Sequence, residues 1–390
     1  MVTIKAFDSE ITIERFLAKK YVAKEAPTLI LLAGIHGNEI SGIFAIQNVL
    51  RQIEELKLVF KGNFYAISGN LNAISKGIRY EDVDLNRLWT TERIDVLEEK
   101  TDNFTPEEKE QKELLSIIRN IFTEHSGDFF FVDLHTTSSP TTPFITISDS
   151  INNRCFSANF PVPVVLGIEE YIHGPLLTYI NEFGYIGIGF EAGQHQEPQA
   201  TKINEAFIWM LLVQTGCFKM EEIEDYNNYR DILNQLNDFK GQFFEIDYKY
   251  SIKETENFKM LKGFKNFQPI KKNENLAVSD NQPVKSHLKG RIFMPLYQSQ
   301  GEDGFFIVSI ISNFWLVLSR NVRKMYLHNF LRILPGIKQS KTSKYTLIVN
   351  PGTAKFLTNE IFHLFGYRRK VKNNGKWYFT KRDRKIIRFE

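Results

Sequence analysis

The stretch LILLAGIHGNEISGIF, residues 29–44, decides how the rest of the chain is interpreted. An apolar run ends at Gly34, a polar loop carries His36 and Glu39, and apolar residues then recur at helical spacing. This order predicts a buried strand, a loop and a helix. The loop offers a nitrogen and a carboxylate oxygen to a metal ion beside Gly37, where the backbone can bend. Most pairs with this spacing are solvated surface residues, so the loop alone does not establish a metal site.

Three further apolar runs within residues 1–220 are followed by polar residues and helical patterns. GNFYAIS, DFFFVDLH and YIGIGFEAG predict buried strands, and TPEE at residues 105–108 predicts the capped start of a helix. Continuous apolar strands that alternate with helices are typical of parallel sheets covered on both faces. We therefore predict an α/β domain with a mainly parallel sheet and helices on both faces.

Potential ligands and acids follow four of these strands. His36 and Glu39 come after the first strand, Asn70 after the second, His135 ends the third and Glu191 lies at the end of the fourth. Open α/β sheets bind ligands at the carboxyl ends of their strands. We therefore expect these side chains to form one site.

The sequence changes in character twice after residue 220. An acidic linker helix and short alternating segments with turn residues predict a β-rich domain. Residues 320–390 hold 18 Lys and Arg against 3 Asp and Glu, whereas the preceding residues hold 31 against 43. We predict a catalytic α/β domain at 1–220, the linker and β-rich domain at 221–319 and a basic α+β extension at 320–390. Within the extension, Asn374-Gly375 predicts a hairpin.

Composition restricts the class of protein. With 43% hydrophobic residues among 390 the chain can bury a large core, and two cysteines, Cys155 and Cys217, are too few for a disulfide framework. No run approaches the ~20 apolar residues of a membrane span, and the N-terminus lacks the apolar core of a signal peptide. We expect a cytoplasmic protein that has no membrane partner.

The basic extension leaves the binding of a polyanion open. A solvated basic face, or one that docks on the acidic body, is the favoured interpretation, so nucleic acid is not an expected partner. The oligomeric state also stays open.

The polar residues at the strand ends suit zinc chemistry. Catalytic zinc sites use three protein ligands drawn from His and carboxylate groups, and His36, Glu39 and His135 are the best candidates. Zinc bound in this way lowers the pKa of its water to about 7 and polarises a carbonyl group, as amide hydrolysis requires. Glu191 is placed to act as the general base that carries the proton of the water to the leaving amine, and a surface carboxylate is the alternative interpretation.

Four motifs in order, GIHGNE, RYEDVDLNR, DLH and GFEAG, resemble the succinylglutamate desuccinylase/aspartoacylase family, a branch of the zinc carboxypeptidase-like α/β hydrolases. GFKNFQPIKKNENLA and MPLYQSQGEDGFF also look like the C-terminal β domain of that family, so the resemblance covers about residues 25–320. It implies a zinc carboxypeptidase-like fold and one Zn²⁺ per chain, held by His36, Glu39 and His135. It also implies that Glu191 is catalytic.

The motif RYEDVDLNR carries the substrate contacts that the resemblance implies. Arg79, Asn86 and Arg87 match the substrate-contacting positions of the family, and Asp84 is a supporting carboxylate. Two guanidinium groups in one polar loop suit a substrate carboxylate or a developing oxyanion, so Arg79 is also assigned to catalysis. The implied partner is a small anionic N-acyl amino acid.

Departures from the family pattern concern specificity and the extension. Aspartoacylases have an arginine about ten residues before the catalytic glutamate, where this chain offers Asn181, so N-acetylaspartate is expected to be a poor substrate. Tyr297 is a candidate for the active-site tyrosine that the β domain supplies in some members, although an exposed or core tyrosine is favoured. His195 lies near the strand of Glu191 and could support the site, but an ordinary loop histidine is the favoured interpretation. Because the resemblance does not extend to residues 320–390, that extension is expected to be separable from the chemistry.

The leading hypothesis is zinc-dependent hydrolysis of the amide bond of a small N-acyl amino acid by a metal-activated water, with Glu191 as general base. One alternative is a zinc carboxypeptidase-like peptidase, which a β domain that narrows access to the zinc would exclude. The other is a non-catalytic binding protein with a polyanion-binding tail. Because a binding role needs no base, the presence of the glutamate together with all three ligands argues for the enzyme. The identities of the acyl group and the amino acid stay open.

Overall fold

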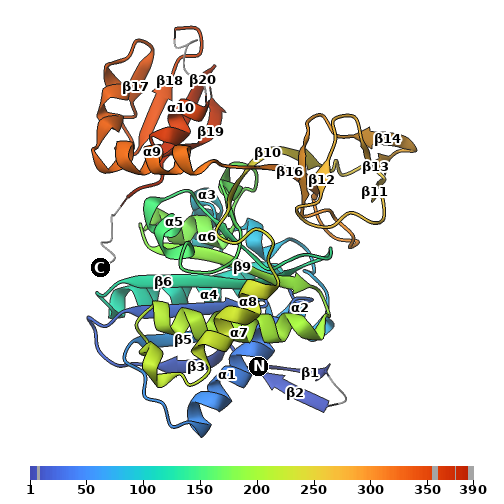
Figure 1. The fold of residues 1–390 in the computed structure, drawn as a ribbon, viewed down its shortest axis with the longest axis vertical. Helices are drawn as coiled ribbons and strands as arrows, with labels where there is room; N and C mark the ends of the chain where they lie inside the picture. Colours follow the sequence, from blue (N-terminus) through green and yellow to red (C-terminus); the bar gives the residue numbers. More distant parts are fainter. Residues whose placement is uncertain (7–8, 354–358, 374, 385–390) are drawn as a thin grey trace.

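The computed structural model describes residues 1–6, 9–353, 359–373 and 375–384. One 11-stranded sheet runs through the body of the molecule and on into the β-rich region (Figure 1). Its strands are, in spatial order, β12 (Pro269–Ile270), β15 (Gly290–Phe293), β16 (Asp303–Ile310), β10 (Phe243–Ser251), β8 (Val164–Leu166), β7 (Phe144–Ile147), β9 (Ile186–Gln194), β6 (Phe129–Thr137), β4 (Thr28–Ala33), β5 (Asn63–Ser68) and β3 (Phe16–Lys20).

Helices connect the strands of the body, and others precede or follow the β-rich region. The α-helices are α1 (Ser41–Glu55), α2 (Leu71–Lys76), α3 (Thr91–Glu99), α4 (Pro106–Glu124), α5 (Ile151–Ser157), α6 (Leu176–Glu182), α7 (Pro198–Gln214), α8 (Tyr226–Gln235), α9 (Asn313–Lys324) and α10 (Asn359–Leu364). Short 3-10 helices are η1 (Leu85–Arg87), η2 (Ile168–Glu170), η3 (Met220–Glu222) and η4 (Leu327–Ile333). At the start of α4, Thr105 and Glu108 cap each other's backbone N–H groups, as the sequence predicted.

The centre of the sheet is parallel. Strands β5, β4, β6 and β9 run in the same direction, and every residue of β4 and β6 is buried. Leu29 and Leu31 of β4 pack in one core with α1 and α7. Ile30 and Leu32 point to the other face, where they pack with α4 and α6. Helices cover both faces, so the predicted α/β class with a mostly parallel central sheet is confirmed.

Two short strands of the sheet do not follow from the sequence pattern. β7 and β8 are four and three residues long, too short to display a period. β7 runs antiparallel to β9, and β8 runs parallel to both β7 and β10. At the start of the chain, β1 (Val2–Ala6) and β2 (Ser9–Ile13) form a separate two-stranded sheet.

The β-rich region is joined to the body by backbone hydrogen bonds. β10 pairs in parallel with β8 and antiparallel with β16, so the large sheet continues from one region into the other. A three-stranded sheet completes the region, with strands β11 (Phe258–Met260), β13 (Asn275–Ser279) and β14 (Gln282–Lys285).

The residues after β16 form α9, η4, α10 and a four-stranded antiparallel sheet. Its order is β17 (Ile337–Gln339), β18 (Thr346–Val349), β20 (Lys376–Lys381) and β19 (Tyr367–Asn373). β19 and β20 pair with Asn373 opposite Lys376, as a turn at 374–375 predicts, although Asn374 itself lies outside the described residues.

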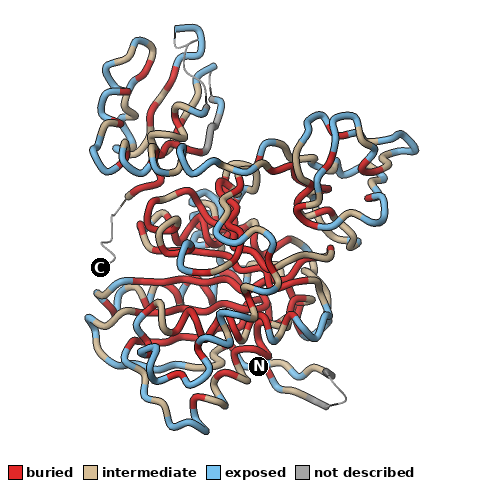
Figure 2. Tube along the Cα trace, in the orientation of Figure 1, coloured by how far each residue is buried: buried red, intermediate tan, exposed pale blue. Residues whose placement is uncertain are grey.

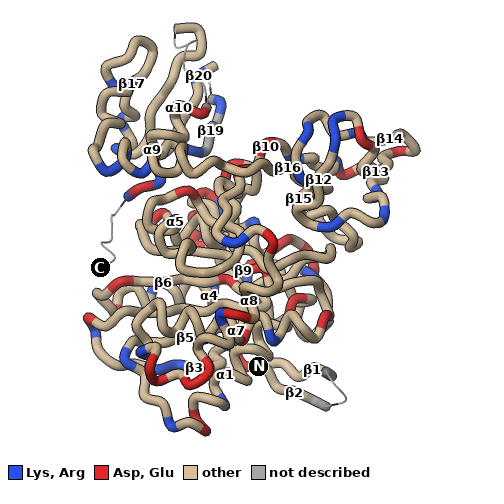
Figure 3. The backbone as a smooth tube through the Cα atoms, viewed as in Figure 1, with Lys and Arg blue, Asp and Glu red and all other residues tan. Residues whose placement is uncertain are grey.

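Lys and Arg occur along α9 and β19 (Figure 3). Buried residues fill the sheet and helices of the body (Figure 2). Among the described residues, no helix has the length and apolar character to cross a membrane.

Candidate active site

The loop after β4 carries His36 and Glu39 at the carboxyl edge of the sheet. Glu39 N donates to His36 O at 3.1 Å, and Gly37 N donates to Arg79 O at 3.1 Å. A Cβ on Gly37 would lie 2.1 Å from the backbone carbon of Ala73, so only glycine fits there. This close approach of two backbones brings Arg79 beside the pair.

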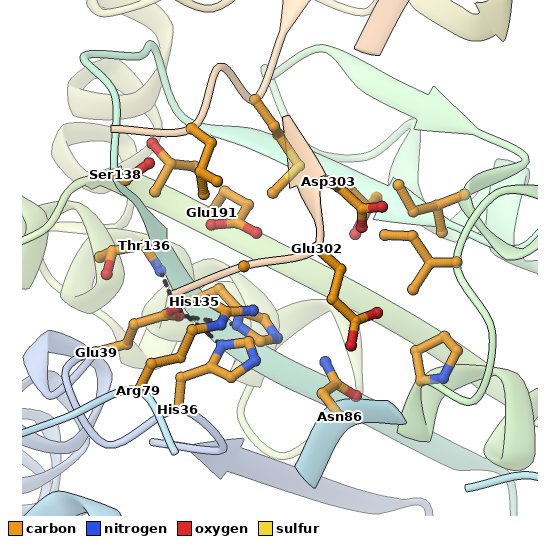
Figure 4. Close-up of a pocket in the computed structure, with 18 of the residues that line it drawn as sticks. His36, Glu39, Arg79, Asn86, His135, Thr136, Ser138, Glu191, Glu302 and Asp303 are labelled. Carbon is orange, nitrogen blue, oxygen red and sulfur yellow. Dashed lines mark hydrogen bonds and ion pairs between the residues drawn. The ribbon is translucent and has the colours of Figure 1, made fainter. Parts of the chain in front are cut away.

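Two other side chains reach the same edge from neighbouring strands. His135 on β6 and Glu191 on β9 are partners in the register of the parallel ladder. Partners on adjacent strands project to the same face of a sheet. His135 and Glu191 therefore line one cavity together with His36 and Glu39 (Figure 4).

His36, Glu39 and His135 converge. His36 Nδ1 lies 2.9 Å from Glu39 Oε1, and His135 Nδ1 lies 3.0 Å from Glu39 Oε2. All three residues are buried, and their potential ligand atoms lie within 4.8 Å of one another. The structure thus brings together, in one group that could hold a metal ion, the three residues that the sequence singled out.

The far nitrogen of each imidazole also faces a carboxylate. His36 Nε2 lies 3.1 Å from Asp84 Oδ1, and His135 Nε2 lies 2.9 Å from Asp133 Oδ2. A neutral imidazole has one N–H, so it cannot donate to acceptors on both sides. A cation between the two Nδ1 atoms and Glu39 would satisfy the second nitrogen of each ring, while the Nε2–H faces the outer carboxylate. The donor set therefore fits Zn²⁺.

The pKa values in this cluster also indicate that its carboxylates are stabilised by positive charge. Burial raises the pKa of Glu39, but His36 and His135 outweigh burial and hold it well below its usual value. Burial lowers the pKa of His135, yet Asp133 and Glu39 bring it well above its usual value. A divalent cation at this point would supply the positive charge that the carboxylates otherwise draw from the imidazoles.

Asp133 belongs to the DLH motif, but no role was predicted for it from the sequence. It is fully buried and lies two positions before His135 on β6, so both side chains point to the same face. The available signal was the Asp-x-His spacing within a buried strand, where a carboxylate needs a partner.

Asp133→Asn is expected to weaken zinc binding by about 10- to 100-fold, the range for groups that orient metal-bound histidines. Asn keeps the shape of the side chain but removes the charge that faces His135 Nε2. Competition with a zinc chelator measures the affinity. Asp95→Asn, on the exposed side of α3, is the matched control and should have no effect. An unaltered affinity in the Asp133 variant would exclude it from the site.

Glu191 has an uncommitted oxygen. Its Oε2 atom is buried and has no hydrogen-bond partner among the described residues. Burial raises the pKa of Glu191 to about 8, while His135 opposes the rise and Glu39 and Asp133 add to it. A carboxyl group with a pKa near neutrality and a free oxygen can take up and release a proton.

Asp84 connects the cluster to the other predicted residues. It accepts hydrogen bonds from Arg79 NH2 at 3.0 Å and from Asn86 N at 2.8 Å, and it lies 3.7 Å from Arg87 NH1. Burial raises the pKa of Asp84, but His36 and the two arginines outweigh burial and hold it well below its usual value. Arg79, Asn86 and Arg87 of RYEDVDLNR thus line the cavity, and Asp84 contacts all three of them.

The two arginines differ in their environments. Arg79 NH1 donates to Glu39 Oε1 at 3.3 Å. Burial lowers the pKa of Arg79, but Asp84 and Glu39 raise it above its usual value. Arg87 NH2 donates to Asp303 Oδ2 at 3.4 Å, which is a long contact for such a pair. Arg79 is therefore held firmly beside the cluster, whereas Arg87 has weaker partners.

Residues of the β-rich region close the cavity. Asp303 begins β16 and Glu302 directly precedes it, and Glu302 extends towards Asn86 (Figure 4). Asn86 Oδ1 accepts a hydrogen bond from Leu176 N at 2.9 Å, so its NH2 group is the part left for a ligand. The cavity has a volume of about 130 Å³. A space of this size suits a small molecule or one end of a larger one.

His195 lines the cavity and was misinterpreted from the sequence. Its Nδ1 lies 2.7 Å from Thr136 Oγ1, and its Nε2 lies 3.2 Å from Gln298 Oε1. Gln298 also accepts a hydrogen bond from Asn38 at 3.2 Å. His195 therefore links the strand that bears His135 to the loop before β16, and nothing in the local sequence announces this long-range contact.

Two residues considered for specificity do not reach the cavity. Asn181 Nδ2 donates to Leu177 O at 2.6 Å, and its Oδ1 accepts from Asn153 at 2.8 Å within the core. Asn181 therefore does not stand in the cavity in place of the aspartoacylase arginine, because α6 turns this side chain inward. The Tyr297 hydroxyl donates to Leu261 O at 2.8 Å in the β-rich region.

Comparison with known proteins identifies the family. The chain matches the succinylglutamate desuccinylase/aspartoacylase catalytic domain over residues 25–210. A succinylglutamate desuccinylase of Shewanella pealeana is 30% identical over 241 residues, which cover 56% of this chain and 68% of the relative. An N-acyl-aromatic-L-amino acid amidohydrolase (carboxylate-forming) of Xenopus laevis is 24% identical over 231 residues, with coverage of 56% and 68%. The chain belongs to the succinylglutamate desuccinylase/aspartoacylase family.

A solved structure shows the same fold. The succinylglutamate desuccinylase/aspartoacylase of Rhodobacter sphaeroides superimposes with a TM-score of 0.55 at 16% identity and covers 74% of this chain and 87% of its own. In sequence, the chain matches two further relatives over only 55% and 40% of the length of those relatives. Membership in the family indicates an N-acyl amino acid deacylase, a hydrolase of amide bonds.

Proposed function

We propose that this protein is a zinc-dependent enzyme that hydrolyses the amide bond of small N-acyl amino acids. The observation that carries the proposal is the convergence of His36, Glu39 and His135 beside the uncommitted carboxyl of Glu191. Zinc held by the three ligands would lower the pKa of a water molecule to about 7 and polarise the substrate carbonyl.

Side chains of the protein transfer the proton, stabilise the developing negative charge and orient the metal ligands. Glu191 Oε2 accepts the proton of the attacking water and returns it to the leaving nitrogen. Arg79, held by Asp84 and Glu39, stabilises the negative charge that develops on the substrate carbonyl oxygen. Asp84 also orients His36, as Asp133 does His135 on the opposite side of the cluster.

Recognition of the substrate carboxylate is assigned to Arg87 and Asn86. The contacts of Arg87 with Asp303 and Asp84, at 3.4 and 3.7 Å, are long enough to exchange for shorter bonds to a carboxylate. Among the described residues that line the cavity, Arg79 and Arg87 are the arginines, and no lysine joins them. A substrate with one carboxylate is therefore favoured over N-acetylaspartate, which has two.

The proposal is tested by metal analysis followed by a panel of substrates. Purified protein is expected to carry one zinc per chain and to release the free amine from N-acyl amino acids, with N-acetylaspartate among the poorer ones. The small cavity disfavours long peptides as substrates. A higher kcat/KM for long peptides would support the peptidase alternative, and zinc-loaded protein that cleaves neither class would support a binding role.

Arg87→Ala is expected to lower kcat/KM for N-acyl amino acids by about 10- to 100-fold, because a hydrogen bond to a charged group contributes ~1.5–3 kcal/mol. Zinc content should not change. Arg93→Ala, on the exposed face of α3, is the matched control. If the Arg87 variant cleaves neutral amides and carboxylates as the wild type does, the assigned role of Arg87 is wrong.

A further inference from the structure

Asp149 is a fully buried carboxylate that three arginines surround. Arg154 Nε donates to it at 2.5 Å, Arg323 NH2 at 3.0 Å and Arg368 Nε at 2.8 Å. Arg154 belongs to α5 of the body, whereas Arg323 and Arg368 come from α9 and β19. The Arg323 side chain is itself fully buried. Charged side chains of the C-terminal residues therefore reach into the body and bind a buried carboxylate there.

A second set of contacts lies at η2. Arg368 NH1 donates to Glu170 Oε1 at 3.3 Å, and Arg382 Nε lies 3.2 Å from Glu169 Oε1. A Cβ on Gly167, which has a φ of +79°, would lie 3.1 Å from Arg368 NH1. A glycine at the start of η2 thus leaves room for the guanidinium group to pack against the backbone.

Asp383 and Arg384 complete the junction. Asp383 Oδ1 accepts a hydrogen bond from Ile151 N at 2.7 Å, in the first turn of α5. Arg384 NH1 donates to Glu182 O at 3.0 Å, at the end of α6. The residues after β16 therefore contact three parts of the body: the start of α5, η2 and the end of α6.

The side chains that form ion pairs at this junction balance in charge only when both sides are present; Arg384, which donates to a backbone carbonyl, is not among them. The body supplies one arginine and three carboxylates: Arg154, Asp149, Glu169 and Glu170. The C-terminal residues supply three arginines and one carboxylate: Arg323, Arg368, Arg382 and Asp383. Each side alone would leave two unbalanced charges in a buried place, which is unfavourable.

The same parts of the body form a wall of the candidate active site. Ser148 directly precedes Asp149, Ile168 begins η2 and Leu177 lies in α6, and all three line the cavity. Asp149 N also donates to Glu169 Oε1 at 3.3 Å, which ties two of these segments together. The junction and the cavity are therefore one residue apart at Asp149 and two residues apart at Glu170.

We propose that Arg323 and Arg368 are positioning residues for the substrate: through Asp149 and Glu170 they hold the cavity wall of Ser148 and Ile168 in the geometry that binds it. This inference rests on the proposed function. It replaces the expectation that residues 320–390 are separable from the chemistry. It also means that some of the basic residues of this segment bind buried carboxylates of the body.

Hydrogen exchange of the full-length Arg368→Gln variant tests the coupling without reference to activity. The variant leaves Asp149 and Glu170 short of a charged partner, so exchange in peptides covering 144–151 and 164–172 is expected to rise by about tenfold or more. Exchange in α1 should not change. Lys338→Gln removes a positive charge from an exposed position of β17 and is the matched control, which should alter neither segment.

Kinetics test whether the coupling reaches the substrate. With an N-acyl amino acid, Arg368→Gln is expected to raise KM by about 3- to 30-fold. The kcat should change less than KM, and the zinc content should be unaltered, because the metal ligands are not touched. Glu170→Gln removes the same contact from the body side and is expected to give the same division between KM and kcat. A merely structural role would reduce the amount of folded protein and leave the KM of the remainder unchanged.

Other outcomes decide against the proposal or against the proposed function separately. Arg368→Lys keeps the charge and serves if the glutamine variant does not fold; a smaller rise in exchange in the same peptides is then expected. A folded variant with unaltered exchange at 144–151 and 164–172 would overturn the proposal, and so would faster exchange with an unaltered KM. If exchange rises as expected in the Arg368 variant but the wild type hydrolyses no N-acyl amino acid, only the proposed function is contradicted.

Discussion

Glu191→Gln is expected to lower kcat by about 10²- to 10⁴-fold, the contribution of general-base catalysis. Glutamine has the shape of glutamate but does not take up a proton in the physiological range. The lost group is a buried oxygen that no described residue engages. Zinc content should stay at that of the wild type, because Glu191 is not among the proposed ligands. Steady-state kinetics and elemental analysis measure the two quantities.

The pH profile gives the Glu191 assignment a second test. A general base must be deprotonated, so kcat/KM should rise with pH through the pKa of Glu191. Without a metal ion, burial raises that pKa to about 8, and a bound cation would lower it. The acidic limb is therefore expected below pH 8 in the wild type and should be lost in Glu191→Gln. Glu221→Gln, at an exposed position, is the matched control. Near-normal turnover in the Glu191 variant would assign the proton transfer to another group.

His135→Ala is expected to remove most of the bound zinc. The substitution takes away one of three ligands, and it leaves the buried carboxylate of Asp133 without the imidazole 2.9 Å away. Elemental analysis after dialysis measures the loss. His287→Ala, an exposed histidine of the β-rich region, is the control and should retain the metal. Full zinc content in the His135 variant would show that the ligand set is different.

Much of the site could be predicted because its residues lie at the ends of apolar strands. His36, Glu39, His135 and Glu191 are each adjacent to a run whose burial is evident from composition alone, and a parallel sheet brings such ends together. Asp133 was assigned no role, although it lies in the DLH motif, because a carboxylate within an apolar strand has no local signature beyond its spacing to His135.

Contacts between distant segments could not be predicted. The hydrogen bonds of His195 with Gln298 depend on how β16 enters the large sheet. The orientation of Asn181 depends on the rotation of a short helix, which a seven-residue element does not encode clearly. For residues 320–390, a count of charges indicated an excess but not which arginines are buried. The division of the chain at 220 and 319 stays a prediction.

The pairing of β10 with β8 has a consequence for fragments of the protein. Strand β8 is the last strand of the body on its side of the sheet, and β10 satisfies its outer N–H and C=O groups. A piece that stops at residue 220 would bare this edge, a row of unpaired backbone groups flanked by apolar side chains. Such an edge is a template for pairing with other chains. A fragment of residues 1–220 is therefore expected to self-associate through β8.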